Sequence, residues 1–398
     1  MDLLWPEFLQ LIYLDNHATT PIDPAVLDLM MRFQQEHFAN SASVTHAAGR
    51  EVAELVDSAM QQIASGVGAR SDEIVITSGA TESNNLAVFG YCLHPRQKRR
   101  KVVSLVSEHR AMLDPLKRLE KQGFEVVLLP VKDRLADVPG EVDLARVESA
   151  IDEETALVSV MLANNEIGVQ QPLRAIASMC QRVGAILHSD ASQAVGRVPL
   201  EVDELGVDLM SFSAHKFYGP KGVGGLFVRR HERPVCLQAQ IFGGGQQHNL
   251  RSGTLNSPGV MGMGAAMSLS EELLHEEPKR LDSLRDRLYE GLKKIEGVEL
   301  NGPRLDDAVR LPGNLNCSFM PFEGQSLMLA MPELCVSSGS ACTSSEPEPS
   351  HVLAAIGFSP DESRSSLRFG VGRMNTEQEI DAAVELVAAA VEKLRRMI

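Results

Sequence analysis

Short apolar segments alternate with amphipathic segments through the first two-thirds of this 398-residue chain. The apolar segments are of strand length, and several are unbroken apolar runs, which is typical of strands buried on both faces of a sheet. They are residues 73–77, 102–106, 125–129, 156–161, 185–188, 208–213 and 224–228. Helical patterns lie between many of them, including residues 50–66, 114–122 and 173–183. This order predicts an α/β domain with a mainly parallel seven-stranded sheet flanked by helices.

The character of the sequence changes after Pro258. A strongly helical stretch comes first, and strand candidates and a terminal helix follow it. These elements are residues 260–296, 314–319, 366–370 and 376–396. We therefore predict a large α/β domain at residues 13–262 and a smaller α+β domain formed by residues 263–398 together with residues 1–12.

The composition excludes several classes of function. The formal net charge of −15 and the pI of about 5.2 disfavour a protein that binds the phosphate backbone of nucleic acid. No apolar run approaches the roughly 20 residues that span a bilayer, and the amino-terminal segment lacks the basic residues of a signal or transit peptide. The six cysteines form no C-x-x-C pair, so we expect no disulfide framework and no metal site. A cytoplasmic protein without nucleic-acid or membrane partners is the expectation.

Residues 73–90 read as a strand, a Ser-Gly-Ala-Thr turn and a helix. The unpaired amides at the start of such a helix, together with the Thr81 hydroxyl, form an anion site because the helix dipole favours negative charge there. A phosphate group suits this site. Ordinary helix capping by Thr81 is the alternative interpretation.

Lys216 follows the strand predicted at 208–213, and Ser213 and His215 lie close to it in the sequence. Most lysines are surface charges, but a lysine that a strand delivers into an interior crevice loses solvation and becomes able to form an imine. Asp190 follows the strand predicted at 185–188, where it could cap a helix or keep a pyridine nitrogen protonated. The phosphate site, the amine and the acid together suit the phosphate, aldehyde and ring nitrogen of one cofactor.

Three further polar residues suit the same ring. His109 follows the strand predicted at 102–106 and could lie over the ring face as a stacking group and proton shuttle, with a structural histidine as the alternative. Asn165 and Gln193 could bond to a ring hydroxyl oxygen, or each could be a turn residue.

Cys342 stands among small polar residues, in VSSGSACTSSEPEPSHVL at 336–353. Ser, Gly and Thr at this density favour a loop, and the two prolines prevent a helix before Ser350, which could cap the residues that follow. We expect an exposed thiol on a mobile segment. An incidental loop cysteine is the alternative interpretation.

Seven motifs in register make the chain similar to the cysteine desulfurases, which are pyridoxal 5′-phosphate (PLP) enzymes of the class-V aminotransferase group and fold type I. The resemblance extends from about residue 13 to residue 396. It is carried by LDNHATTPIDP at 14–24, TSGATESNNLA at 77–87, NNEIG at 164–168, HSDASQAVG at 188–196, SFSAHKFYGPKGVGG at 211–225, RSGT at 251–254 and SSGSACTSSEPEPSHVL at 337–353.

The resemblance implies a role for each candidate residue. Lys216 corresponds to the lysine that holds PLP as a Schiff base, and Cys342 corresponds to the nucleophile that becomes a persulfide. Arg368, with Asn165, corresponds to the binding site of the substrate carboxylate. The remaining positions match cofactor contacts: the Ala80 main chain, Thr81, Ser213 and His215 at the phosphate, Asp190 at the pyridine nitrogen, Asn165 and Gln193 at the ring oxygen, and His109 above the ring.

The activity implied is removal of sulfur from L-cysteine, which leaves L-alanine and a persulfide for iron–sulfur cluster assembly or another sulfur acceptor. Thr254 matches a phosphate ligand supplied by the neighbouring subunit, so a homodimer is implied as well. A selenocysteine lyase, another class-V enzyme and a non-catalytic scaffold of the same fold are the alternatives.

Two segments depart from the family pattern, GGGQQHN at 243–249 and FANSAS at 38–43. The chain also ends at EKLRRMI, so docking of a scaffold protein through the extended tail of some members is not expected.

Overall fold

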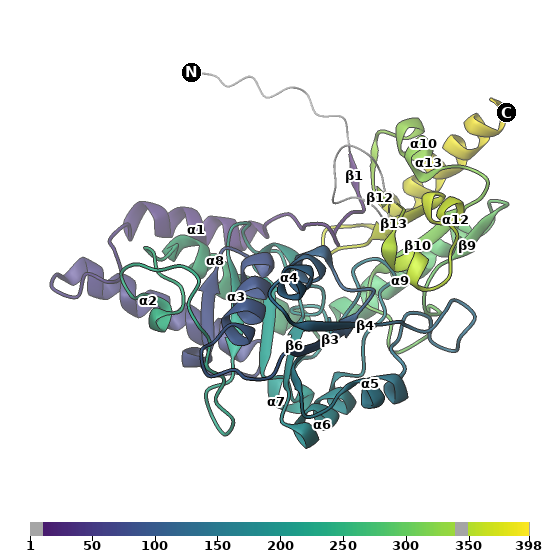
Figure 1. The fold of residues 1–398 in the computed structure, drawn as a ribbon. Helices are drawn as coiled ribbons and strands as arrows, with labels where there is room; N and C mark the ends of the chain where they lie inside the picture. The colour runs from purple at the N-terminus through teal and green to yellow at the C-terminus, as the bar shows by residue number, and fades with distance from the viewer. Residues whose placement is uncertain (1–10, 339–348, 398) are drawn as a thin grey trace.

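The computed structural model describes residues 11–338 and 349–397, and its largest sheet has seven strands (Figure 1). They run in the order β2-β8-β7-β6-β5-β3-β4, with β8 antiparallel to both of its neighbours and the other pairs parallel. The predicted α/β class with a mainly parallel seven-stranded sheet is therefore confirmed. The strands are β2 (Ile74–Thr77), β3 (Lys101–Leu105), β4 (Glu125–Leu129), β5 (Thr155–Ser159), β6 (Ile186–Asp190), β7 (Leu209–Ser213) and β8 (Gly224–Val228).

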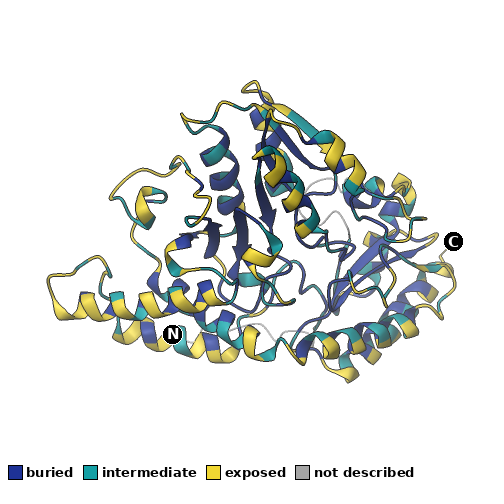
Figure 2. Cartoon of the chain, turned by 90° about the horizontal axis from the view of Figure 1, so that it is seen from below, coloured by how far each residue is buried: buried dark blue, intermediate teal, exposed yellow. Residues whose placement is uncertain are grey.

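Helices cover both faces of this sheet, which explains the unbroken apolar strands (Figure 2). Leu209 and Leu226 pack with Leu86 of α3 on one face, whereas their sequence neighbours Met210 and Phe227 belong to the core on the other face. The helices of this part are α1 (Pro24–Glu36), α2 (Ala47–Ser65), α3 (Ala80–Cys92), α4 (Arg110–Glu120), α5 (Leu144–Ala150), α6 (Leu173–Val183), α7 (Val202–Leu205) and α8 (Ser257–Leu273), with short 3₁₀ turns η1 (Ser71–Glu73), η2 (Ala214–Lys216) and η3 (Gln247–Asn249).

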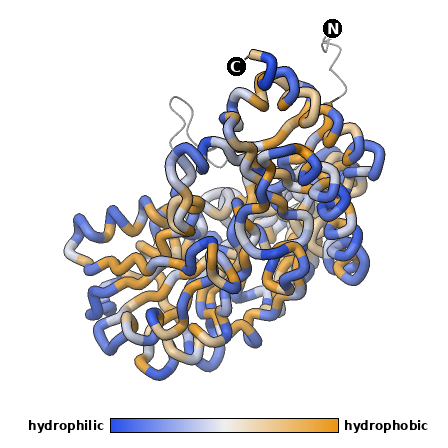
Figure 3. The backbone as a smooth tube through the Cα atoms, turned by 90° about the vertical axis from the view of Figure 1, so that its right-hand side faces the viewer, coloured by the Kyte–Doolittle hydropathy of each residue, from blue (hydrophilic) through white to orange (hydrophobic). Residues whose placement is uncertain are grey.

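A second apolar core is formed by the carboxyl-terminal part of the chain, with Leu288, Leu315, Phe369 and Val387 among its buried residues. A four-stranded antiparallel sheet in the order β12-β13-β10-β9 supports it, and β1 pairs with β11 beside it. Its elements are β1 (Ile12–Tyr13), α9 (Glu277–Leu292), β9 (Val298–Leu300), β10 (Asn314–Phe319), α10 (Gly324–Ala330), β11 (Leu334–Cys335), β12 (Ser337–Ser338), α11 (His351–Ala355), α12 (Pro360–Arg364), β13 (Ser366–Gly370) and α13 (Glu377–Arg395). Figure 3 shows apolar residues concentrated inside both parts.

The division into two domains stays a proposal. Residue 262, the boundary predicted from the sequence, falls inside α8, which packs on α1 and α2 of the first core. We therefore propose that the boundary lies between α8 and α9, after Leu273.

One edge of the large sheet gathers the ends of several strands and is the edge where ligands bind in folds of this type. β6 ends at Asp190 there, β7 ends at Ser213, and β2 leads into the start of α3. The start of β8 and the turn before α3 lie very close together at this edge, because a Cβ atom added to Gly224 would lie 2.6 Å from the Cα atom of Gly79. Within the described residues, no helix is both long and apolar enough to cross a membrane.

Candidate active site

A cavity of about 500 Å³ opens at this edge of the sheet, and residues from both cores line it. It brings together most of the predicted site residues, from six separate segments of the sequence. They are Ala80, Thr81, His109, Asn165, Asp190, Gln193, Ser213, His215, Lys216 and Arg368.

The start of α3 forms one end of the cavity. Gly79 precedes the helix with φ of +149°, a conformation that favours glycine, and no side chain caps the helix. The first amides of the helix therefore point outward without an intrahelical acceptor, next to Ser213 and His215. Burial, with the nearby charges of Lys216 and Lys221, lowers the pKa of His215 to about 4, so its ring is neutral at pH 7. This end of the cavity suits a phosphate group.

Asp190 provides a carboxylate at another wall of the cavity. The residue is 7% exposed and accepts three hydrogen bonds. Asn84 Nδ2 donates to Asp190 Oδ2 at 2.7 Å, and the backbone N and Oγ of Ser192 donate to Oδ1 at 3.0 and 2.6 Å. These donors hold the carboxylate in place.

Lys216 reaches the cavity from the turn after β7. Its Nζ donates to the carbonyl oxygens of His17 at 2.6 Å and Ala18 at 2.9 Å. The amine therefore lies against the turn that follows β1.

His109 precedes α4, and its Nδ1 accepts a hydrogen bond from the Ala111 backbone at 3.0 Å. Burial lowers the pKa of His109, although the Asp190 charge opposes this shift. The ring is therefore neutral at pH 7, and its proton is on Nε2 because Nδ1 is an acceptor. His109 can donate a hydrogen bond through Nε2.

Arg368 in β13 is 5% exposed and lies where the two cores meet. Its Nη2 donates to Asp15 Oδ1 at 2.8 Å and to Ser337 Oγ at 3.1 Å, and its Nη1 donates to the Asn165 carbonyl at 3.2 Å. Among the described residues its buried Nε has no hydrogen-bond partner. A guanidinium with a donor to spare at a cavity wall suits an anionic group.

The comparisons with known proteins agree with this geometry. Residues 12–383 match the family model described as aminotransferase class-V. The chain belongs to the class-V aminotransferase family. A relative named cysteine desulfurase IscS, from Anaeromyxobacter sp. (strain K), is 47% identical over 97% of this chain and 94% of its own length. The resemblance to cysteine desulfurases that the sequence motifs carry is confirmed.

Two solved structures resemble this class-V aminotransferase in fold. One, described as a NifS-like protein, has a TM-score of 0.87 and 34% identity, covering 97% of this chain and 99% of that chain. The other, described as SspA in complex with cysteine, has a TM-score of 0.77 and 32% identity, covering 90% of this chain and 98% of that chain.

The class-V aminotransferases related to this chain depend on PLP, and the donor set of the cavity fits that group. The uncapped start of α3 suits the phosphate, the hydrogen-bonded carboxylate of Asp190 suits a protonated ring nitrogen, and the Lys216 amine suits the aldehyde. When bound, PLP supplies an electron sink for charge that develops at the substrate Cα.

Two predicted residues are not among those that line the cavity. Thr254 is exposed, and its predicted contact with a neighbouring subunit stays a prediction because the structure holds one chain. Cys342 lies outside the described residues. Its flanking segments are described, and Ser337 lines the cavity.

Sequence reasoning missed several cavity residues. Asp15 and His17 lie in the LDNHATTPIDP motif, which carried the resemblance but received no role. Ser192 and Ser337 are small polar residues of common types. Ser192 lies two residues after Asp190, so its position at a strand end could have identified it as a site residue. No local sequence feature distinguishes Ser337.

Glu166 is a buried carboxyl beside the cavity residue Asn165, and it joins two parts of the fold. It accepts a hydrogen bond from the hydroxyl of Ser350, which also caps α11 as the sequence predicted. Burial raises the pKa of Glu166 to about 7, although Ser350 and the charge of Arg368 oppose this shift. In the folded protein the Glu166 carboxyl is therefore mostly protonated at pH values between the ordinary pKa of glutamate and about 7.

This shift predicts a pH-dependent stability. Because the folded state binds a proton that the unfolded state releases near pH 4.3, the free energy of unfolding falls as pH rises from about 4.3 to about 7 by on the order of 3 kcal/mol. Glu166→Gln removes the titration but keeps an oxygen for Ser350. As pH rises from about 4 to about 8, the free energy of unfolding of the variant should increase by that amount relative to wild type. Urea unfolding of the apo protein measures this difference.

The exposed Glu296 provides the matched control for this measurement, since its side chain is 90% exposed. Glu296→Gln should follow the wild-type dependence. An unchanged pH dependence in Glu166→Gln would show that the Glu166 carboxyl is already ionised in the folded protein.

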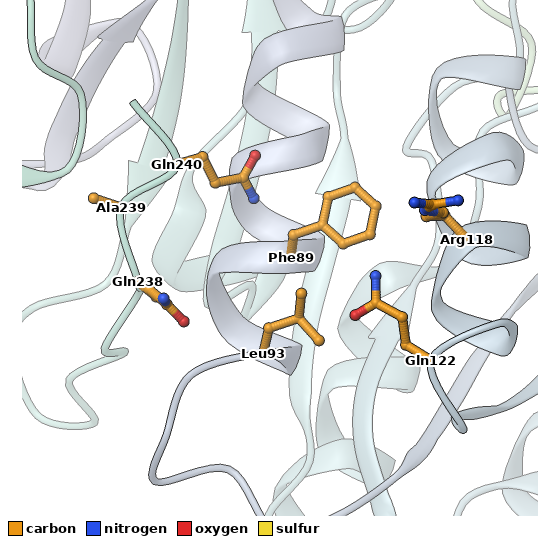
Figure 4. Close-up of a pocket in the computed structure, with 7 residues that line it drawn as sticks. All are labelled: Phe89, Leu93, Arg118, Gln122, Gln238, Ala239 and Gln240. Carbon is orange, nitrogen blue, oxygen red and sulfur yellow. The ribbon is translucent and has the colours of Figure 1, made fainter. Parts of the chain in front are cut away.

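A smaller surface cavity of about 350 Å³ lies between α3, α4 and the segment after β8 (Figure 4). Phe89 and Leu93 form its apolar side, and Arg118 and three glutamines surround them. The residues that line it include no carboxylate, thiol or imidazole, so they cannot carry out acid–base or nucleophilic chemistry.

Proposed function

We propose that this class-V aminotransferase is a PLP-dependent cysteine desulfurase, which converts L-cysteine to L-alanine and takes the sulfur onto Cys342 as a persulfide. One observation carries the proposal: Lys216, Asp190, Arg368 and the uncapped start of α3 converge on one cavity in a chain whose relatives are named cysteine desulfurase. In this proposal Lys216 holds the cofactor, with the remaining contacts as the family motifs assign them.

The substrate carboxylate is assigned to Arg368. Its unpartnered Nε and the Asn165 side chain at the same wall supply donors for a carboxylate. Asp15 already shares the guanidinium, so an incoming carboxylate must compete with that ion pair. A neutral substrate side chain, such as the thiol of L-cysteine, adds no further negative charge to this wall.

Proton transfer at the substrate is assigned to two residues. Lys216, freed from the cofactor when substrate binds, is the base that accepts the Cα proton at Nζ. His109 carries a proton on Nε2 when neutral and can donate a hydrogen bond to a group above the ring.

Cys342 is assigned the role of nucleophile, and chain length supports this assignment. Ser337 bonds to Asp15 Oδ1 at 2.9 Å at the cavity, and Ser350 bonds to Glu166 next to Asn165. Cys342 is four positions after Ser338 in the sequence. Four residues of fully extended chain reach at most about 14 Å. The thiolate would attack the substrate sulfur, and the Cβ–S bond of the substrate would break.

A homodimer and a sulfur-acceptor protein complete the proposal, with the cytoplasm as the expected location. The segment after β8 exposes two adjacent apolar side chains, Ile241 to 41% and Phe242 to 78%, which a second subunit could cover. Arg251 in the same segment pairs with Glu82 of α3 at 2.9 Å. This contact brings the segment that contains Thr254 close to the phosphate end of the cavity, where a neighbouring subunit could share it.

Mass spectrometry of the purified PLP-loaded protein after brief exposure to L-cysteine tests the proposed function. We expect one added sulfur atom on the peptide that contains Cys342, together with release of L-alanine. L-selenocysteine in a parallel reaction identifies a selenocysteine lyase if it alone is turned over. A protein that binds PLP but forms no alanine from L-cysteine would refute the proposal.

A further inference from the structure

Arg197 is a buried arginine whose guanidinium contacts two segments of the active site. It follows β6, and 4% of the residue is exposed. Its Nη2 donates to the carbonyl oxygens of Asn16 at 2.7 Å and Lys216 at 3.1 Å, and its Nε donates to the Lys216 carbonyl at 3.3 Å. Its Nη1 lies 3.1 Å from Nδ1 of His17. The guanidinium therefore joins the turn after β1 to the backbone of Lys216.

The hydrogen-bond partners of Arg197 are neutral groups. Within the described part of the chain, Arg197 forms no ion pair with a carboxylate; its acceptors are carbonyl oxygens and a ring nitrogen. Burial lowers the pKa of Arg197, although Tyr218 and the charge of Glu277 oppose this shift. A buried charge of this kind costs free energy unless its hydrogen bonds compensate for it, so a role beyond stability is a reasonable inference.

The contacts of Arg197 extend to two groups that face the cavity. Lys216 Nζ donates back to the carbonyl oxygens of His17 and Ala18 in the same turn. His17 also contacts Gln193, whose Nε2 donates to the His17 carbonyl at 2.9 Å. Gln193 Oε1 and Arg197 Nη1 both lie 3.1 Å from His17 Nδ1, and only one of these two contacts can be a hydrogen bond, because a ring nitrogen either donates or accepts. The positions of Lys216 and Gln193 therefore both depend on the turn that Arg197 holds.

We propose that Arg197 is a positioning residue, which fixes the Lys216 backbone and the turn at residues 16–18 in one arrangement so that the Lys216 amine meets the cofactor aldehyde and then the substrate Cα. This inference rests on the proposed function and deepens it. Arg197 itself touches neither cofactor nor substrate in this proposal. Two chain segments that are distant in the sequence are held together by one planar group with several donors, a role that lysine fills poorly.

The chain offers a matched control in Arg310. This arginine is 3% exposed and donates to the carbonyl oxygens of Asn301, Pro303 and Asn314, and within the described residues it also forms no ion pair. Burial lowers the pKa of Arg310 to about 9. Arg310 and Arg197 both line a cavity of about 530 Å³ that is separate from the active-site cavity, but the hydrogen bonds of Arg310 include none to Lys216 or to the turn at residues 16–18. Because both arginines are buried and donate mainly to carbonyl oxygens, substitutions at the two positions should disturb folding in similar ways.

The experiment compares Arg197→Lys and Arg197→Met with Arg310→Lys and Arg310→Met as PLP-loaded proteins. Borohydride fixes PLP on Lys216, and peptide mass spectrometry measures the fixed fraction without any turnover. In Arg197→Met we expect a smaller fixed fraction and a kcat about 10²-fold lower, because a displacement near 1 Å costs about that much, with KM for L-cysteine little changed. Arg197→Lys should recover part of the fixed fraction and part of kcat. Both Arg310 variants should lower the unfolding temperature yet retain the wild-type fixed fraction and kcat.

Two results would overturn the inference. One is an Arg197→Met protein with wild-type fixed fraction and kcat; the other is an Arg310→Met protein that loses both to the same extent. If Arg197→Met does not fold, Arg197→Lys decides by the same two measurements. A wild-type protein without activity on L-cysteine would refute the proposed function, while the fixed fraction would still decide the role of Arg197.

Discussion

Lys216→Ala is expected to lower sulfide release from L-cysteine by at least about 10⁴-fold, because it removes both the amine that binds the cofactor and the base that accepts the Cα proton. The structure places this amine against the His17 and Ala18 carbonyl oxygens, at the wall of the cavity that contains Asp190. Since the phosphate end and Asp190 remain, the variant should still bind PLP, but without a covalent link. Sulfide and alanine assays give the activity, and borohydride trapping gives the covalent link.

Lys101 provides the control for this substitution. It is a lysine with a side chain only 12% exposed, and it pairs with Asp152 at the start of β3, remote from the cavity lining. Lys101→Ala should lose some stability and keep full activity and the full covalent link. A Lys216→Ala protein that still carries borohydride-fixed PLP on another lysine would show that the cofactor lysine has been assigned wrongly.

Cys342→Ala should eliminate persulfide formation and reduce sulfide release by at least about 10³-fold while the cofactor stays bound, because only the nucleophile is lost. The cofactor contacts assigned above all come from residues 80–254, so no part of the PLP cradle depends on this thiol. The absorbance of bound PLP and its shift when L-cysteine binds should match wild type. Mass spectrometry after L-cysteine exposure should find no added sulfur.

Cys236 is the matched thiol, since it is free and exposed but distant from the cavity lining. Cys236→Ala should retain both the persulfide on Cys342 and full sulfide release. Persulfide found on Cys236 or on the half-buried Cys335 in the Cys342→Ala protein would transfer the nucleophile role to that residue.

The strands of the large sheet could be predicted closely from the sequence because local composition controls them. The predicted segments at 125–129 and 224–228 coincide with β4 and β8, and that at 102–106 is displaced by one residue from β3. An apolar run buried on both faces gives a strong signal, since helices cover both sides. The antiparallel orientation of β8 had no such signal. It is determined by the short connection from β7 rather than by the residues of β8.

The candidate site was predictable where its residues end strands or begin helices. Asp190 ends β6, and Lys216 lies in the turn just after β7, so parallel packing alone brings them to one edge. Arg368 and Ser337 come from the second sheet, and their place at the cavity follows only from how the two cores pack. Arg368 was predicted from the family resemblance alone. The residues around Ser337, His17 and Arg197 gave no local indication that these side chains would lie in or beside the site.

The amino-acid sequence by itself determined the elements and the chemical groups: where apolar runs become strands, and which amine and acid follow those strands. Only the tertiary structure decided which carbonyl oxygens hold Lys216, which buried guanidinium forms no ion pair among the described residues, and which carboxyl has its pKa raised by burial. The physical reason is that strand and helix formation depends on neighbours along the chain, whereas desolvation and hydrogen-bond partners depend on residues brought close from distant positions.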